Sequence, residues 1–90
     1  MGLEHVEFFL KVEAEFGLTL SREEERTLRT MADVYRCIAR YQTGIAPELA
    51  PPPDDERWRR LASILEAFPG VRPEHVRWET DLYKDLALGG

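Results

Sequence analysis

Residues 21–41 read SREEERTLRTMADVYRCIARY, and this stretch decides the fold class. Ser21, followed three residues later by Glu24, matches a capping box, in which two side chains satisfy free backbone N–H groups at the start of a helix. Thr30 opens a second N-cap signal that includes Asp33. After it, apolar residues recur at helical spacing: Met31, Val34, Tyr35, Ile38 and Tyr41. The stretch therefore predicts a short helix that ends near Leu28 and a longer helix that begins after Thr30.

The segment from Leu3 to Phe16 also has helical periodicity, and Gly17 is a plausible stop. At about 100° per residue, its apolar residues form two neighbouring stripes. The first stripe is expected to fill the core and contains Phe8, Phe9, Val12 and Phe16. The second contains Leu3, Val6 and Leu10, and it lies beside Glu4 and Glu7. This second stripe is either covered by a neighbouring helix or free to dock a basic, apolar partner.

Residues 43–53 contain four prolines and a glycine, which predicts a semi-extended linker between two halves, 1–42 and 54–90. Beyond it, acidic residues precede an apolar helical stripe made of Trp58, Leu61, Ala62, Leu65 and Phe68, and Pro69-Gly70 stops this helix. Residues 71–80 are expected to form a loop anchored by Val71, Val76 and Trp78. The run with Leu82, Leu86 and Leu88 is too short to assign. We predict one all-α domain, 1–90, with four helices.

Composition narrows the possible functions. The chain has 17 acids against 12 bases and a formal net charge of −5, which argues against nucleic acid as the main ligand. A single cysteine excludes a disulfide framework. No apolar run is long enough for a membrane span, and the start lacks a secretory signal pattern. We therefore expect a soluble, cytoplasmic protein.

No catalytic constellation stands out. The sequence has no Gly-rich phosphate loop, no His-Glu-x-x-His and no Gly-x-Ser-x-Gly. His5, His75 and Cys37 are not at the spacing of paired metal ligands. Three arginines, Arg57, Arg59 and Arg60, follow the acids Asp54, Asp55 and Glu56, which cancel much of their field, so a solvated helix face is expected there. We expect no enzymatic activity, no cofactor and no metal site.

The pieces of the chain resemble an acyl carrier protein in a permuted order. Residues 2–17, which begin GLEHVEFF and end VEAEFG, resemble the acidic second helix of that family, and RTMADVY at 29–35 resembles the start of its last helix. Residues 58–68 resemble its first helix, GVRPEHV at 70–76 its following loop, and TDLYKDL at 80–86 the approach to its attachment site. Read as 54–90 and then 3–42, the sequence runs like a whole carrier domain. The resemblance therefore implies a circularly permuted four-helix bundle, closed within one chain or completed by domain swapping.

The resemblance departs from the family at the attachment site. Carriers use Asp-Leu-Gly-x-Asp-Ser-Leu, and the serine takes the phosphopantetheine arm. Counting from Asp85-Leu86 places the serine position on Gly90, and the following Leu-Asp corresponds to Leu3-Glu4. Glycine cannot form the phosphodiester. The resemblance thus implies the fold and a docking helix, with Leu3, Glu4, Val6, Glu7 and Leu10 as the partner-binding residues, and it does not imply carrier chemistry.

Three functions remain open. The first is an acyl-carrier-like domain without the arm that binds a protein, such as an enzyme of acyl or peptide metabolism. The second is a working carrier modified at Ser21, Ser63, Cys37 or the C-terminal carboxylate. The third is a structural module whose role is dimerisation by exchange of its halves.

Overall fold

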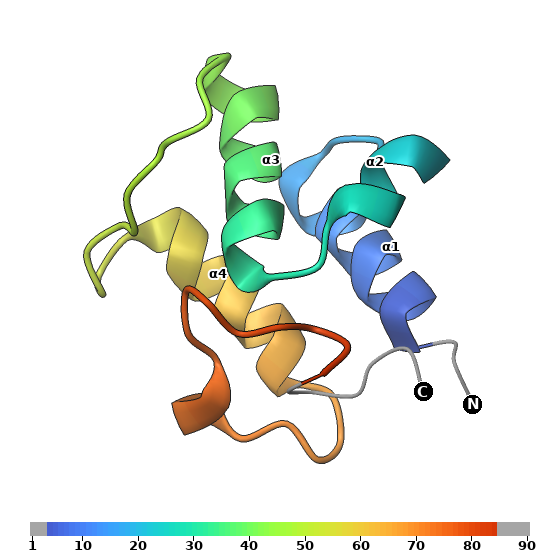
Figure 1. Ribbon diagram of the computed structural model, residues 1–90, viewed down its shortest axis with the longest axis vertical. Helices are drawn as coiled ribbons and strands as arrows, with labels where there is room; N and C mark the ends of the chain where they lie inside the picture. Colours follow the sequence, from blue (N-terminus) through green and yellow to red (C-terminus); the bar gives the residue numbers. More distant parts are fainter. Residues whose placement is uncertain (1–3, 85–90) are drawn as a thin grey trace.

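The computed structural model describes the backbone of residues 4–84 and the side chains of residues 5–84. Four α-helices follow one another: α1 (Glu4–Phe16), α2 (Arg22–Thr27), α3 (Met31–Thr43) and α4 (Glu56–Glu66). A single 3₁₀ turn, η1 (Pro73–His75), follows α4 (Figure 1). Across residues 4–84 no strand forms, and the β-type pairing consists of one isolated bridge between Thr30 and Asp81. The prediction of an all-α fold with four helices is confirmed.

Both N-cap signals form complete capping boxes. The Ser21 hydroxyl accepts the Glu24 N–H at 3.1 Å, and the Glu24 carboxylate accepts the Ser21 N–H at 2.9 Å. Thr30 and Asp33 make the same reciprocal pair at 3.1 and 3.2 Å. These bonds satisfy N–H groups that have no partner inside a helix. The boxes therefore fix the starts of α2 and α3.

Two helix ends differ from the sequence prediction. Helix α3 continues through Thr43, whose hydroxyl donates to the Ala39 carbonyl at 2.8 Å, so the linker begins only at Gly44. Gly44 closes the helix with a left-handed φ of 83°, which glycine adopts without a Cβ clash. Helix α4 begins at Glu56, because the Asp55 carboxylate caps it by accepting the Trp58 N–H, and it ends at Glu66. Phe68 nevertheless remains buried after the helix ends.

The core lies where α1, α3 and α4 meet, and α4 packs against both other helices (Figure 1). Each of these helices contributes the apolar stripe that its sequence period defines, except that Tyr41, at the end of the α3 stripe, is 47% exposed. The fully enclosed large side chains are Phe8, Phe9, Val12, Met31, Val34, Ile38, Leu61, Leu65 and Leu82. The first stripe of α1 therefore fills the core as predicted.

The segment after α4 crosses the end of the bundle and binds the start of α3. The Met31 and Ala32 N–H groups each donate at 2.9 Å, to the Thr80 and Trp78 carbonyls respectively. The Leu82 N–H donates to the Arg29 carbonyl at 2.7 Å. Val76 is buried, as the loop prediction required, and Leu82, which the sequence left unassigned, is a core residue. This segment thus supplies acceptors for the first turn of α3.

Among residues 4–84, no helix is long and apolar enough to span a membrane.

Candidate docking surface

One face of α1 remains uncovered. Val6 is 42% exposed and Leu10 is 58% exposed, and Ala14, one turn further on, is exposed as well. We call Val6, Leu10 and Ala14 the α1 strip. The opposite face of the same helix is in the core, so the strip is not a consequence of a loose helix. Of the partner-binding residues expected from the sequence, Val6, Glu7 and Leu10 are exposed together, whereas Leu3 and the Glu4 side chain lie outside the described residues.

The edge of the strip beside α2 is basic. A groove of about 400 Å³ lies between Val6 and Phe9 of α1, Arg22, Glu25 and Arg26 of α2, and His5 and Tyr83. Within residues 5–84, neither the Arg22 nor the Arg26 guanidinium makes a side-chain hydrogen bond or an ion pair. These arginines could not be placed at the site from the sequence, because α2 has no apolar stripe that would indicate its orientation.

The far edge of the strip is acidic. Successive residues of a helix are about 100° apart around its axis. In this angular order, Val6, Leu10 and Ala14 lie progressively further from α2, and Glu7 follows Ala14. Glu7 is exposed. Beyond it, the Lys11 ammonium lies 5.2 Å from the centroid of the Phe68 ring, and Glu15 accepts from the Arg60 guanidinium at 2.7 Å. On one side the strip is therefore bordered by cations that have no side-chain partner among residues 5–84, and on the other by a carboxylate.

The two ends of the described chain meet beside the strip. The His5 and Tyr83 ring centroids are 6.0 Å apart, with a 57° angle between the rings. The Asp81 carboxylate accepts the Tyr83 and Lys84 N–H groups, both at 2.8 Å, and these bonds, chiefly the one from Lys84, hold its pKa below the usual value. The His5 Nδ1 is buried and has no hydrogen-bond partner within the described residues. The segment that ends at Lys84 thus leads directly to the first turn of α1.

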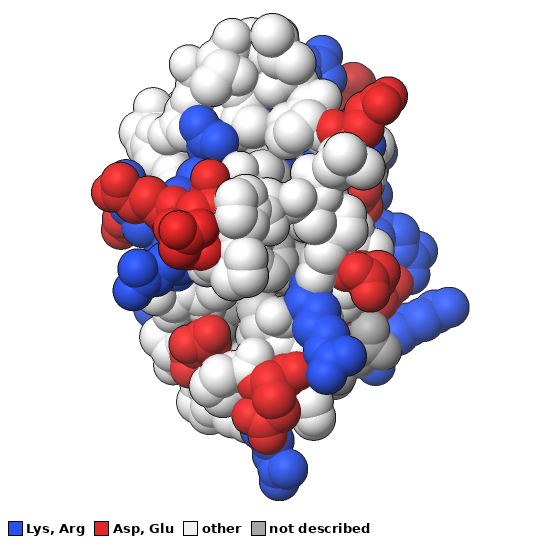
Figure 2. Space-filling view, turned by 90° about the vertical axis from the view of Figure 1, so that its left-hand side faces the viewer, with Lys and Arg blue, Asp and Glu red and all other residues white. Residues whose placement is uncertain are grey.

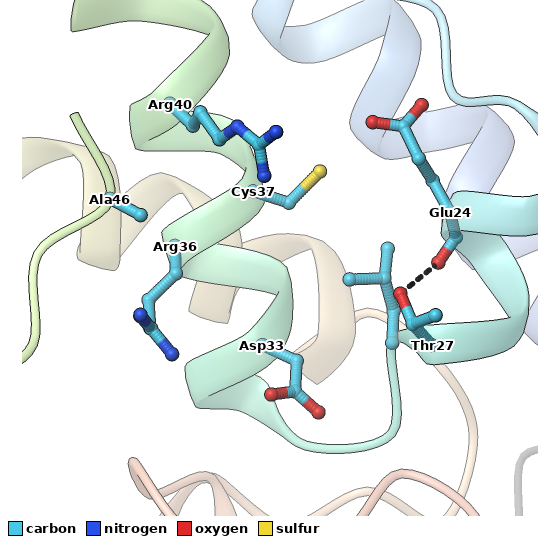
Figure 3. A pocket seen from close by; sticks show the side chains of 8 residues that line it. Glu24, Thr27, Asp33, Arg36, Cys37, Arg40 and Ala46 are labelled. Atoms are coloured by element: carbon cyan, nitrogen blue, oxygen red, sulfur yellow. Dashed lines mark hydrogen bonds between the residues drawn. The ribbon is translucent and has the colours of Figure 1, made fainter. Parts of the chain in front are cut away.

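A second pocket, of about 270 Å³, separates α2 from α3 (Figure 3). Figure 3 shows the Cys37 sulfur turned toward Glu24 across this pocket. Burial raises the pKa of the Cys37 thiol, and the nearby Glu24 carboxylate raises it further, so the thiol is protonated at neutral pH. The two carboxylates of the pocket, Glu24 and Asp33, are the acceptors of the capping boxes. The pocket therefore contains a thiol that is a poor nucleophile, beside two carboxylates that cap the N-termini of α2 and α3.

The other candidate residues do not come together. His5, His75 and Cys37 form no shared site, and no group of potential metal ligands occurs among residues 5–84. Ser21 is used as an N-cap, and Ser63 is exposed on α4.

The arginines of α4 make contacts inside the molecule. Arg57 donates to Gln42 at 2.6 Å and to the Tyr35 hydroxyl at 3.3 Å, and that hydroxyl donates to Asp55. Arg60 is paired with Glu15. Only Arg59 fits the expected solvated face without such a contact in the described chain. The cluster therefore fastens α4 to α1 and α3 rather than forming a free basic patch.

The linker carries two exposed apolar side chains that the sequence analysis did not single out. Ile45 is 73% exposed and Leu49 is 82% exposed. The linker runs along the left of Figure 1, and Figure 2, which looks onto that side, shows a broad uncharged area with charged groups at its borders. The prolines around Ile45 and Leu49 could have indicated this exposure from the sequence, because they keep the segment out of any helix that could bury these residues.

No protein-family model, curated protein or solved structure matches this chain.

Proposed function

We propose that this protein is an acyl-carrier-like domain in circularly permuted order that lacks the attachment serine and acts by binding another protein through α1. The observation that carries the docking role is the exposure of Val6 and Leu10 on a helix whose other face is enclosed. Apolar side chains on a monomer surface that are bordered by charges are typical of a contact surface. Enzymes of acyl or peptide metabolism are the partner class that the resemblance suggests.

The contact between His5 and Tyr83 supports the permuted order. In a carrier domain, the stretch before the attachment site continues directly into the second helix. In this chain the corresponding stretch, 80–84, ends beside the first turn of α1, although the two are at opposite ends of the sequence. The short α2 between α1 and α3 fits the same helix order.

A second placement of the attachment motif puts its serine position at this contact. Gly2-Leu3-Glu4-His5-Val6 matches the Gly-x-Asp-Ser-Leu part of the motif, with Glu4 for the aspartate and His5 for the serine. Gly90, the position given by the first count, lies outside the described residues. In both placements the residue has no hydroxyl, so no phosphodiester can form there.

The alternative of a carrier modified elsewhere has three side chains to draw on. The Ser21 hydroxyl already accepts a capping hydrogen bond, and the Cys37 thiol has a raised pKa. Ser63 is exposed, although it lies on α4, away from the joint between His5 and Tyr83. These environments favour the interpretation without an arm. A purely structural role through exchange of halves predicts a dimer that sedimentation would detect at micromolar concentration.

The docking role is tested by Val6→Arg, with Ser63→Arg as a control of the same chemistry at an exposed position on α4. Each variant is used as bait with a photo-crosslinker in place of Ala14, which leaves Glu7 intact. The proposal expects wild type and Ser63→Arg to crosslink the same partner, and Val6→Arg to lose at least about nine-tenths of it, since burying an unpaired guanidinium costs more than about 1.4 kcal/mol. Unchanged crosslinking by Val6→Arg, with an unchanged helical melt, would reject this surface.

A further inference from the structure

The α1 strip has edges of opposite charge at the same height along the helix. Arg22 and Arg26 line the groove beside Val6, and Glu7 is the next residue along α1. Glu25 also lines the groove, so the described residues that line it carry one net positive charge. A surface with this arrangement is complementary to a copy of itself, provided that the two copies meet in the correct orientation.

Symmetry decides which orientation is allowed. A two-fold axis parallel to α1 places the two strips face to face, with the two α1 helices running in the same direction. Each residue then lies opposite residues at the same position along the helix. In this arrangement each acidic edge meets the basic edge of the other copy. A two-fold axis perpendicular to α1 within the contact plane brings acidic edge onto acidic edge and basic onto basic. Like charges in contact oppose association. The charges therefore select the parallel pairing of α1 helices.

We propose that a second copy of this chain covers the α1 strip, in a parallel two-fold dimer in which Glu7 of each copy faces Arg22 and Arg26 of the other. Leu10 lies at the centre of this contact, between Val6 and Ala14. The inference rests on the proposed docking role of the strip and adds its regulation: self-pairing occupies the surface that another partner needs. Because the strip is small, the dimer forms only at high protein concentration, as expected for an interface at the low end of the size range.

Charge reversal gives a test with an internal rescue. In a dimer of Glu7→Lys, the new lysine of each copy faces the arginines of the other. In a dimer of Arg22→Glu/Arg26→Glu, the new glutamates of each copy face Glu7 of the other. When the two variants are mixed, both edges of the mixed dimer again pair opposite charges. Glu66→Lys and Arg36→Glu/Arg59→Glu make matched changes of charge at exposed positions outside the strip.

Sedimentation velocity from about 10 µM to about 1 mM covers the range of weak interfaces. The proposal expects wild type and the matched controls to dimerise, each strip variant alone to need at least about tenfold higher concentration, and the equimolar mixture to return to the wild-type curve. Arg22→Gln/Arg26→Gln, which adds no acid to α2, should weaken the dimer as well. A melt of each variant verifies that it is folded.

Three results would overturn the proposal: wild type that stays monomeric throughout, strip variants that dimerise like wild type, or a mixture that is not restored. If wild type is monomeric and yet crosslinks a different protein in a Val6-dependent way, the self-pairing fails and the proposed docking role stands. If the dimer forms and no Val6-dependent partner is crosslinked, the self-pairing stands and the proposed docking of a different protein fails.

Discussion

At the scale of single residues, Glu24 has the clearest electrostatic signature. Its carboxylate accepts the Ser21 N–H and the Tyr41 hydroxyl, at 2.9 and 2.7 Å. These two bonds, the first being the larger cause, hold the pKa of Glu24 below its ordinary value. They favour the charged form in the folded state and have no counterpart in the unfolded chain.

This lowered pKa predicts a loss of stability in acid. The unfolded state takes up the proton first, at about pH 4.5, so the contribution of Glu24 is complete above that pH and disappears as the pH falls through the lower folded pKa. Urea titrations between about pH 6 and about pH 3 should show the free energy of unfolding falling. Glu24→Gln keeps an acceptor oxygen and should flatten part of that slope. A slope unaffected by Glu24→Gln would contradict this assignment.

Residue roles were readable from the sequence only where a local pattern encodes them. The capping pairs and the core stripe of α1 are such patterns, and both are confirmed. The positions of Arg22 and Arg26 beside Val6 depend on how α2 packs on α1, and α2 buries no residue of its own that would reveal its orientation. The contact between His5 and Tyr83 joins opposite ends of the chain, so no local pattern could indicate it.

At the scale of elements, the two capping boxes should differ in importance. Helix α3 contributes five buried residues to the core, so fraying of its first turn disturbs packing, whereas α2 buries none. Thr30→Ala should therefore cost about 1 kcal/mol. That cost lowers the melting temperature of a domain of this size by about 4–8 °C. Ser21→Ala should lower it by less, and Thr19→Ala, at an exposed loop position, should leave it unchanged.

Differential scanning calorimetry of the three variants measures this order. A larger loss for Ser21→Ala than for Thr30→Ala would show that α2 is coupled to the core more tightly than its exposure indicates. The element boundaries illustrate why such ends were harder to predict than the helices themselves. Thr43 extends α3 through its bond to Ala39, and α4 ends at Glu66, two residues before the last residue of its apolar stripe, Phe68.

At the level of the whole molecule, the proposed permuted order predicts that the chain can be reopened. Opening it in the linker between Leu49 and Ala50 and joining Gly90 to Met1 would give the order in which the proposal compares the chain with a carrier domain. The linker and the new connection have similar lengths, so closure entropy should nearly cancel and stability should change by less than about 1 kcal/mol. Circular dichroism melts of the reopened protein measure this, with an opening inside α3, between Arg36 and Cys37, as the control that should unfold.

The proposed function requires a carrier-like chain that lacks only the hydroxyl that would take the arm. Intact mass after co-expression with a broad-specificity phosphopantetheinyl transferase tests it most directly, on wild type and on His5→Ser. We expect no phosphopantetheine increment on wild type and an increment on His5→Ser. An increment on wild type, or none on a folded His5→Ser variant, would contradict it.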